Sequence, residues 1–521
     1  MRLRRSILLA LSSGVLQALA QPPFGMWPLA FVAVLPLLLA AEPDQAPGSG
    51  RRNLLLGLVA GLAFYLPGLF WITHTMTVFG ELSWPVSLLL LLGFASIFAI
   101  DMAALLWAFG RALRFGAGAG LAVFPLLWAA MELLKSRLWT GYPWLLASHA
   151  LVPRPELLWP STILGVSFLS ALVVTVSVAL LASIRDVGSK SGAIGFAVLV
   201  LVVIFFGAGF VRNPWARRAG APRPATLRVL VIQPGVPQKA RWDFQERGKI
   251  YRDLLEQTRA AAARTAPELI VWSESSLPFG FDSSLQVQQD VKALAQETGA
   301  SILLNTIREE SEDVYFNSAR VIAPGGSVSE AYDKRHLVPF GEYVPARWIF
   351  GWAGKIVRGI GDFTAGTRAH PLPVGFTREG QKLEALAGVA VCYEAVFPEI
   401  FREASRDGAN FFVTITNDGW YGGLGAEEQH WNGAVVSAVA SGRSLVRAAV
   451  SGISGFVSPD GEVIARIPLG QKGEIAADLP LRADSVPSER CGDVFAWFSA
   501  AIASCVILLS RGRIAKSGGA S

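Results

Sequence analysis

The chain has 521 residues, of which 52% are hydrophobic and only 17% are charged. Soluble proteins carry about 25% charged residues, so these proportions exclude a wholly soluble enzyme and indicate that much of the chain lies in a membrane. The formal net charge of +6 is modest. In a membrane protein, Lys and Arg gather in the cytoplasmic loops. We therefore attribute the positive charge to the orientation of the chain in the membrane and expect no nucleic-acid partner.

Eight apolar runs approach the length of about 20 residues that a membrane-crossing helix needs. They predict helices near residues 5–21, 26–41, 53–73, 84–109, 117–134, 161–184, 192–211 and 494–510. The first run follows the basic "MRLRRS", which is also the pattern of a signal peptide. It continues through "QALAQPPFGMWP" into the second run, which favours a retained hairpin of two helices.

The basic residues between these runs predict which side of the membrane each connection faces. With the N terminus inside, the inner connections hold twelve of them: Arg2, Arg4, Arg5, Arg51, Arg52, Arg111, Arg114, Arg185, Lys190, Arg511, Arg513 and Lys516. The short outer connections hold Lys135, Arg137 and Arg154. Lys and Arg gather on the cytoplasmic side, so both termini are expected there. The chain then divides into a seven-helix bundle (1–212), an outer domain (213–493) and a final helix with a tail (494–521).

The outer domain alternates between strand and helix patterns. Strands are expected in "TLRVLVIQPG", "ELIVWSE", "ASILLNTI", "GVAVCYE" and "NFFVTITND", and hairpins at "APGG" and "SPDG". Helices are expected at 243–264, 284–298, 397–408 and 426–442. Strands that alternate with helices, together with hairpins, predict a layered α/β domain.

Three polar residues follow strand patterns in this domain, where layered α/β folds collect their sites. Glu274 follows "LIVW", Lys334 follows the second arm of a hairpin, and Cys392 ends "AGVAVC". Each also has a structural interpretation: a loop carboxylate or helix cap, a solvated surface charge, and a buried apolar filler.

Together the three residues are suited to nucleophilic catalysis. A thiolate is the nucleophile and needs a nearby base or cation. A carboxylate in an apolar site can take the proton, and a lysine ammonium can stabilise an oxyanion. The remaining cysteines and the five histidines are dispersed, without CxxC, HxH or HExxH spacing, so we expect no metal site. Without GxGxxG or a P-loop, we expect no cofactor.

A Glu–Lys–Cys set in this chain order resembles the nitrilase, or carbon–nitrogen hydrolase, superfamily. The stretches "VWSESSLP", "YDKRHLVPFGEYVP", "CYEAVFPE" and "TNDGWYG", between the seventh and eighth predicted helices, resemble the bacterial apolipoprotein N-acyltransferase family. The resemblance covers essentially the whole chain. It implies a nitrilase-like αββα sandwich inserted before the last helix of an eight-helix membrane bundle.

The resemblance also implies an activity. Members transfer an acyl chain from a phospholipid, typically the sn-1 chain of phosphatidylethanolamine, to the N-terminal α-amino group of a diacylglyceryl-cysteine in an apolipoprotein. Cys392 would form a thioester in a ping-pong mechanism, Glu274 would act as base and acid, and Lys334 would stabilise the oxyanion. The resemblance implies a bacterial inner-membrane location with a periplasmic catalytic domain. For the oligomeric state, we expect a monomer.

Four further residues match family positions. Glu342 in "FGEY" would hold Lys334 or tune Glu274, Tyr393 and Glu394 match "CYE", and Trp242 in "QKARWD" matches a tryptophan on a loop by the active site.

Other segments keep two interpretations each. Residues 140–153 form either a re-entrant piece under the site or an aromatic interface belt, and residues 348–361 either a mobile lid or a packed surface loop. Asp101 and Glu132 lie in apolar runs, where carboxylates are functional candidates, although hydrogen bonding between neighbouring helices is the simpler interpretation.

Two alternative functions remain open at this stage. A tethered hydrolase of small soluble amides or nitriles would use the same three residues, but it gives no reason for seven preceding helices. A lipid-binding or transport bundle with an inactive outer domain would not need Cys392. The bundle lacks the internal repeat and the many polar intramembrane residues typical of transport pathways.

Overall fold

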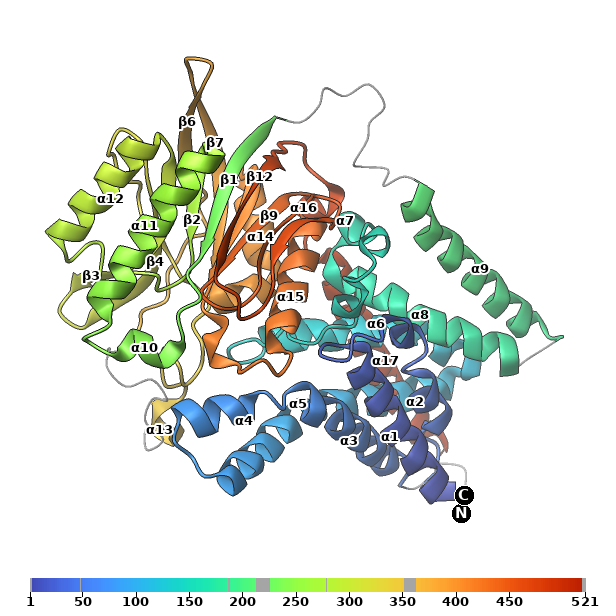
Figure 1. The fold of residues 1–521 in the computed structure, drawn as a ribbon. Coiled ribbons are helices and arrows are strands. Elements are labelled where there is room, and N and C mark those ends of the chain that lie inside the picture. The colour runs from blue at the N-terminus through green and yellow to red at the C-terminus, as the bar shows by residue number, and fades with distance from the viewer. Residues whose placement is uncertain are drawn as a thin grey trace.

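The computed structural model describes residues 2–46, 48–185, 188–211, 225–277, 279–350 and 362–517. A helical bundle and a domain built on two β-sheets lie against one another, and the chain passes from the bundle to the sheets and back (Figure 1). One hydrophobic cluster runs from the bundle helices into the side of the sheet domain nearest to them, so the two parts share a core.

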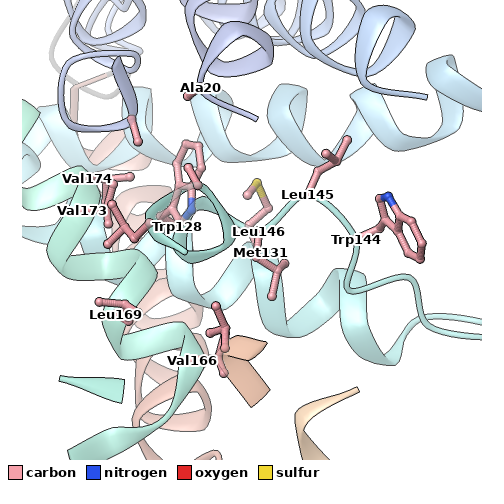
Figure 2. Packing of buried hydrophobic residues seen from close by; sticks show 14 of the residues in the cluster. Ala20, Trp128, Met131, Trp144, Leu145, Leu146, Val166, Leu169, Val173 and Val174 are labelled. Carbon is pink, nitrogen blue, oxygen red and sulfur yellow. The ribbon is translucent and has the colours of Figure 1, made fainter. Parts of the chain in front are cut away.

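The bundle contains long apolar helices and several short broken ones. Its helices are α1 (Arg2–Ala20), η1 (Trp27–Phe31), α2 (Leu35–Ala40), α3 (Ser49–Gly68), α4 (Ile72–His74), η2 (Thr75–Phe79), α5 (Trp84–Ala112), η3 (Leu113–Phe115), α6 (Ala117–Arg137), η4 (Ala147–Leu151), η5 (Pro155–Leu157), α7 (Ser161–Leu164), α8 (Val166–Arg185), α9 (Lys190–Val211) and α17 (Val494–Ser517). Figure 2 shows how α6, α8 and the loop between them pack through residues such as Trp128, Leu146 and Leu169.

Within the described residues, five helices are long and apolar enough to cross a membrane, namely α1, α5, α6, α8 and α9. A sixth span results if α3 is joined to the following α4–η2 segment, which is bent by 59° relative to it. The expected spans at 26–41 and 494–510 are shorter apolar segments. Prolines explain part of the shortening, because Pro28 and Pro36 begin separate short helices and a proline cannot donate a helical hydrogen bond.

Helices α3 and α5 pack closely because small residues meet at their interface. A Cβ atom at Gly57 would lie 2.4 Å from the Met102 carbonyl oxygen, and one at Gly61 would lie 2.7 Å from the Cα of Ala99. The spacing of these glycines is the small-xxx-small pattern that lets membrane helices approach at the backbone. The glycines therefore set the distance between the two helices.

The outer domain has four layers. One sheet has the strand order β12-β1-β2-β3-β4-β5 and the other β11-β10-β9-β8-β7-β6. The strands are β1 (Thr226–Gln233), β2 (Leu269–Trp272), β3 (Ser301–Ser311), β4 (Val314–Ile322), β5 (Tyr332–Asp333), β6 (Leu372–Arg378), β7 (Gln381–Val391), β8 (Phe411–Thr416), β9 (Ser444–Ala449), β10 (Ser454–Val457), β11 (Val463–Ile467) and β12 (Gly473–Pro480). The described helices of this domain are α10 (Gln238–Trp242), α11 (Arg247–Thr265), α12 (Leu285–Thr298), α13 (Arg347–Phe350), η7 (Cys392–Val396), α14 (Pro398–Arg406), η8 (Asp418–Trp420), α15 (Ala426–Ala440) and α16 (Pro487–Cys491).

Three hydrophobic cores hold the layers together. Helices α11 and α12 cover the outer face of the first sheet, and the inner faces of both sheets pack on each other. Helices α14 and α15 cover the second sheet and carry the core that continues into the bundle. In Figure 1 α15 accordingly lies between the sheets and the membrane helices. The nitrilase-like layering expected from the sequence is therefore observed.

We predict that Gly57→Ala lowers the free energy of unfolding in detergent by about 1–3 kcal/mol, the usual cost of overpacking. The new methyl group would displace the Met102 backbone. Gly93→Ala on α5 is the matched control, because a Cβ there meets nothing within 4 Å. Thermal unfolding of both variants measures the effect, and equal midpoints would contradict close packing at Gly57.

Candidate active site

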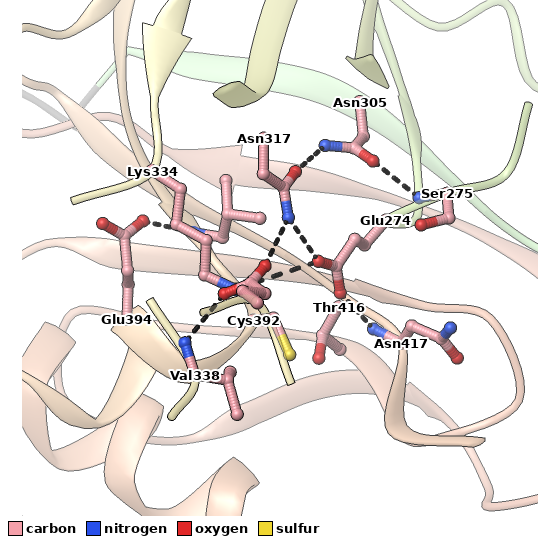
Figure 3. Close-up of polar contacts among 12 residues, drawn as sticks. Glu274, Ser275, Asn305, Asn317, Lys334, Val338, Cys392, Glu394, Thr416 and Asn417 are labelled. Carbon is pink, nitrogen blue, oxygen red and sulfur yellow. Dashed lines mark hydrogen bonds and ion pairs between the residues drawn. The ribbon is translucent and has the colours of Figure 1, made fainter. Parts of the chain in front are cut away.

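Glu274, Lys334 and Cys392 converge at the ends of β2, β5 and β7 (Figure 3). The Nζ atom of Lys334 lies 4.0 Å from Oε1 of Glu274. Lys334 is 1% exposed, and Glu274 and Cys392 are each 6% exposed. Burial rules out the interpretation of Lys334 as a solvated surface charge. The other two structural interpretations fail to explain why the three side chains meet.

Cys392 stands at a sharp change of backbone direction. It follows β7, begins the short helix η7 and has φ of +52°. A non-glycine residue in the left-handed region costs free energy and persists only where its surroundings impose it. The turn therefore needs fixed partners, and it presents the thiol at the end of the sheet.

Burial and the nearby Glu274 carboxylate raise the pKa of the Cys392 thiol to about 12. At neutral pH the group is therefore a thiol, which is a poor nucleophile until a base removes its proton. Glu274 is the neighbouring base, because the carboxylate and the thiol each shift the pKa of the other.

Glu274 is held by two donors and has a perturbed pKa. Its Oε1 accepts a hydrogen bond of 3.0 Å from Asn317 Nδ2, and its Oε2 accepts one of 3.0 Å from the backbone N–H of Asn417. Burial raises the pKa of Glu274, and the Lys334 charge opposes that rise. A carboxylate with a raised pKa is suited to accept and return a proton near neutral pH.

Lys334 is an ammonium group held by Glu342. Its Nζ donates to Glu342 Oε1 at 3.0 Å, and Glu342 Oε2 accepts a 2.8 Å hydrogen bond from the backbone N–H of Val338. Burial lowers the pKa of Lys334, but the charges of Glu342 and Glu274 oppose burial, and the pKa is left raised. The site thus contains a permanent positive charge beside the thiol.

Asn317 joins the two carboxylates and was not among the residues singled out from the sequence. Its Nδ2 donates to Glu342 Oε1 as well as to Glu274 Oε1, each at 3.0 Å. Its Oδ1 accepts a 2.7 Å hydrogen bond from Asn305, whose own Oδ1 accepts from the backbone N–H of Ser275. Asn317 lies in the middle of β4, where its sequence surroundings resemble those of any strand.

The side chains of Glu394 and Tyr393 form hydrogen bonds with backbone groups around the site. Glu394 is fully buried and accepts from the backbone N–H groups of Val391 (2.8 Å) and Arg335 (2.7 Å). It therefore ties the strand end before Cys392 to the residue after Lys334. Tyr393 donates a 2.8 Å hydrogen bond to the Gly141 carbonyl. Trp242 ends α10, but its side chain lies outside the described residues.

The segment 138–146 lies under the site and against the sheet domain. Trp144 is 2% exposed and stacks on Tyr393 with ring centroids 6.5 Å apart. A lipid-facing aromatic belt would be exposed, so burial of Trp144 argues against a belt position for this residue, whereas Trp139 of the same segment is 85% exposed. For the other aromatic segment, residues 351–361 lie outside the described residues.

Both intramembrane carboxylates are bonded within the protein. Asp101 accepts a 2.7 Å hydrogen bond from Tyr65 of α3, which confirms bonding between neighbouring helices. Glu132 accepts from Trp128 within α6 and from the backbone N–H of Ala147, each at 3.0 Å. Lys135, expected in an outer connection, is buried at the end of α6 and contacts Tyr65 and the Trp144 carbonyl.

Comparison with known proteins assigns the two parts of the chain separately. The model of the carbon-nitrogen hydrolase family matches residues 231–484, and that of the apolipoprotein N-acyltransferase N-terminal domain matches residues 13–179. The sheet domain with its Glu–Lys–Cys convergence is thus of the carbon–nitrogen hydrolase class, joined to a membrane bundle.

Relatives over nearly the full length narrow the class to a family. Apolipoprotein N-acyltransferase of Geobacter metallireducens is 36% identical over 97% of this chain and 95% of its own. The Brucella melitensis and Pseudomonas aeruginosa proteins of that name are 34% and 31% identical, each over 91% of this chain and over 90% and 89% of their own. The chain belongs to the apolipoprotein N-acyltransferase family and is an acyltransferase.

Among solved structures, a carbon-nitrogen hydrolase from Helicobacter pylori is 19% identical, with a TM-score of 0.36, over 49% of this chain and 89% of its own. An amidase from Nesterenkonia is 17% identical, with a TM-score of 0.34, over 51% and 94%.

We predict that Asn317→Asp destabilises the protein more at pH 8 than at pH 5. A carboxyl group at this position would face Glu274 and Glu342, so its pKa in the folded state would be raised above the usual value of about 3.9. Stability is then intact below pH 3.9 and is lost as the pH rises through the folded-state pKa.

Asn317→Ala sets the baseline for this experiment, because it removes the same two donors without adding charge. Unfolding midpoints of both variants at the two pH values give the comparison. A gap between the variants that does not widen with pH would contradict the juxtaposition of these carboxylates.

Proposed function

We propose that the protein transfers an acyl chain from a phospholipid to the N-terminal α-amino group of the diacylglyceryl-cysteine of an apolipoprotein. The sn-1 chain of phosphatidylethanolamine is the proposed donor. The observation that carries the proposal is the buried meeting of Glu274, Lys334 and Cys392 next to Tyr393, whose ring stacks on Trp144 of the bundle. Substrates held in the bilayer would reach a site in that place, and the names of the relatives support the acceptor.

The first half-reaction acylates Cys392. Its Sγ attacks the ester carbonyl while Glu274 accepts the thiol proton, and the Lys334 ammonium stabilises the oxyanion that develops. Collapse of the tetrahedral intermediate breaks the ester C–O bond. Glu274 returns the proton to the departing oxygen, so that a lysophospholipid leaves and a thioester remains on Cys392.

The second half-reaction delivers the acyl chain to the amine. The α-amino nitrogen attacks the thioester carbonyl, Glu274 accepts a proton from nitrogen, and the C–S bond breaks as the proton returns to Sγ. The product is an amide and the free enzyme is restored. Burial of the site keeps water from competing for the thioester.

The proposed topology places this chemistry on the periplasmic side of a bacterial inner membrane. Eight spans put both termini in the cytoplasm, with a bundle of residues 1–212, a catalytic domain of 213–493 and a final segment of 494–521. The two shorter apolar segments, Trp27–Ala40 and Val494–Ser510, would complete the eight. The enzyme is proposed to act as a monomer.

We predict that the purified protein incubated with phosphatidylethanolamine gains the mass of one acyl chain. The adduct should be on Cys392, be removed by hydroxylamine and transfer to a diacylated lipopeptide. The measurement is intact-mass spectrometry with mapping of the modified peptide, and Cys392→Ser is the control that should show no adduct.

A folded protein that gives no adduct with any phospholipid, yet releases free acid from small amides, would instead indicate a tethered hydrolase. Lipid binding or movement that is unchanged in the serine variant, without any adduct in either protein, would indicate a non-catalytic role. Each result would contradict the proposed acyl transfer.

We predict that the rate of Cys392 acylation falls as the pH is lowered, with a midpoint above about 4.3, the ordinary pKa of glutamate. The rate falls at low pH because only the ionised Glu274 carboxylate can accept the thiol proton. The midpoint lies above the ordinary value because the pKa of Glu274 is raised. Single-turnover acylation measured across pH gives the profile. Glu274→Gln should be slow and independent of pH in the same range, and a shared acid limb in both proteins would contradict the assignment.

A further inference from the structure

A charged cluster lies behind Cys392 and has no role in the mechanism above. His430 of α15, Asp418 of η8 and Arg447 of β9 are each at most 1% exposed. Burial of charge is costly unless the charges are paired and hydrogen-bonded. A site that maintains such a cluster next to its nucleophile therefore calls for a physical explanation.

The acid and the guanidinium neutralise one another. Arg447 Nη2 donates to both carboxylate oxygens of Asp418, at 3.2 and 2.9 Å, and Thr416 Oγ1 donates to Oδ1 at 2.8 Å. Although burial opposes it, Arg447 holds the pKa of Asp418 well below its usual range. The pair is thus a fixed, neutral support for the third member.

The contacts of His430 show that its Nε2 carries a hydrogen. Its Nε2 lies 2.8 Å from the Cys392 carbonyl oxygen, which can only accept, so Nε2 carries the hydrogen and donates it. Its Nδ1 lies 3.0 Å from Arg447 Nη2, which can only donate, and 3.0 Å from Asp418 Oδ1, which can only accept. Burial and the Arg447 charge lower the pKa of His430, and its bonds to Asp418 and to the Cys392 carbonyl oppose that shift.

This arrangement fixes the peptide group that follows the Cys392 Cα. The residue has a left-handed φ of +52°, a conformation that costs free energy and must be imposed by its surroundings. A donor on the Cys392 carbonyl opposes rotation of that peptide. The direction of the thiol toward Glu274 then depends on the ring of His430.

We propose that His430 is a positioning residue for Cys392. Through its Nε2–H it holds the Cys392 carbonyl, so that Sγ is presented to Glu274, while Asp418 and Arg447 hold the ring in place at Nδ1. The proposal concerns the geometry of the thiol and rests on the proposed function only for its consequence in acyl transfer.

The same turn of α15 is attached to the membrane bundle. Gln429 accepts a 2.7 Å hydrogen bond from Trp144 Nε1 and donates to the carbonyls of Pro22 (2.8 Å) and Gly68 (3.0 Å). The Trp144 ring also stacks on His430, with centroids 5.4 Å apart and planes 29° apart. His430 thus lies between the nucleophile and the surface on which the catalytic domain rests.

The test compares two variants of similar size. Gln at position 430 keeps an N–H near the place of Nε2, whereas Met has no donor, so His430→Gln and His430→Met differ mainly in the proposed interaction. Asn432→Met is the matched control, because Asn432 is also buried on α15 and bonds to the bundle through the His149 carbonyl at 3.0 Å. Thermal unfolding shows which variants are folded.

The readout is the rate of Cys392 alkylation by iodoacetamide, followed by peptide mapping, alongside the rate of acylation by phosphatidylethanolamine. We expect His430→Met to lower both rates by about 10- to 100-fold, the scale of a displacement of about 1 Å in a reacting group, with KM for the phospholipid unchanged. His430→Gln and Asn432→Met should stay within about threefold of the native rates. Because Nε2 keeps its hydrogen whether or not Nδ1 is protonated, the ratio of native to His430→Met rates should be constant between pH 6 and pH 9.

Equal alkylation rates in the Gln and Met variants, or a similar loss in Asn432→Met, would overturn the positioning role. A ratio that changes with pH in that range would overturn the assignment of this hydrogen to Nε2. The alkylation arm separates this inference from the proposed function. Loss of alkylation in His430→Met, in a protein whose native form never acquires an acyl adduct, would support positioning while contradicting acyl transfer.

Discussion

Removal of a lysine ammonium and two carboxylates from water is the constraint on which the site depends. Lys334, Glu274 and Glu342 are stable together only because each has its partners: the ammonium bonds to Glu342, and Asn317 donates to both acids. The same desolvation keeps the Cys392 thiol protonated. In the proposed mechanism the reaction therefore depends on Glu274 instead of on a free thiolate, which would be open to oxidation.

The second constraint is that this polar site adjoins a membrane bundle without breaking the hydrophobic core. The apolar cluster of α14 and α15 continues into α6 and α8, and the polar groups at the boundary are bonded across it, as in Tyr393 with Gly141 and Gln429 with Trp144. Docking of the sheet domain is therefore part of its folding. The catalytic groups take their positions from both halves of the chain.

The sequence was most informative where the signal is local. The strand ends that carry Glu274, Lys334 and Cys392, and the alternation of β1, β2, β3 and β8 with helices, follow from short apolar runs and their polar boundaries. Asn317 reaches the site only because β4 pairs with β3, with Ile307 opposite Asn317, and such pairing between strands leaves no local signal. Strands β6, β9 and β12 were also missed. Strand β9 contains a buried arginine, and β12 shows little alternation between buried and exposed residues. The number of membrane-crossing helices did not follow from composition alone, because prolines and bends divide apolar runs that are continuous in composition.

The pairing of β1 with β12 brings both ends of the catalytic domain to one place, with Thr226 opposite Pro480. The domain is thus inserted into the bundle as a loop would be, and α17 follows it to pack against α5, α6 and α8. Arg137 of α6 and Arg402 of α14 both bind Asp493, just before α17. Because α17 follows the sheet domain in the sequence, it is synthesised only after that whole domain. The bundle can therefore be completed only in a chain that already contains the sheet domain.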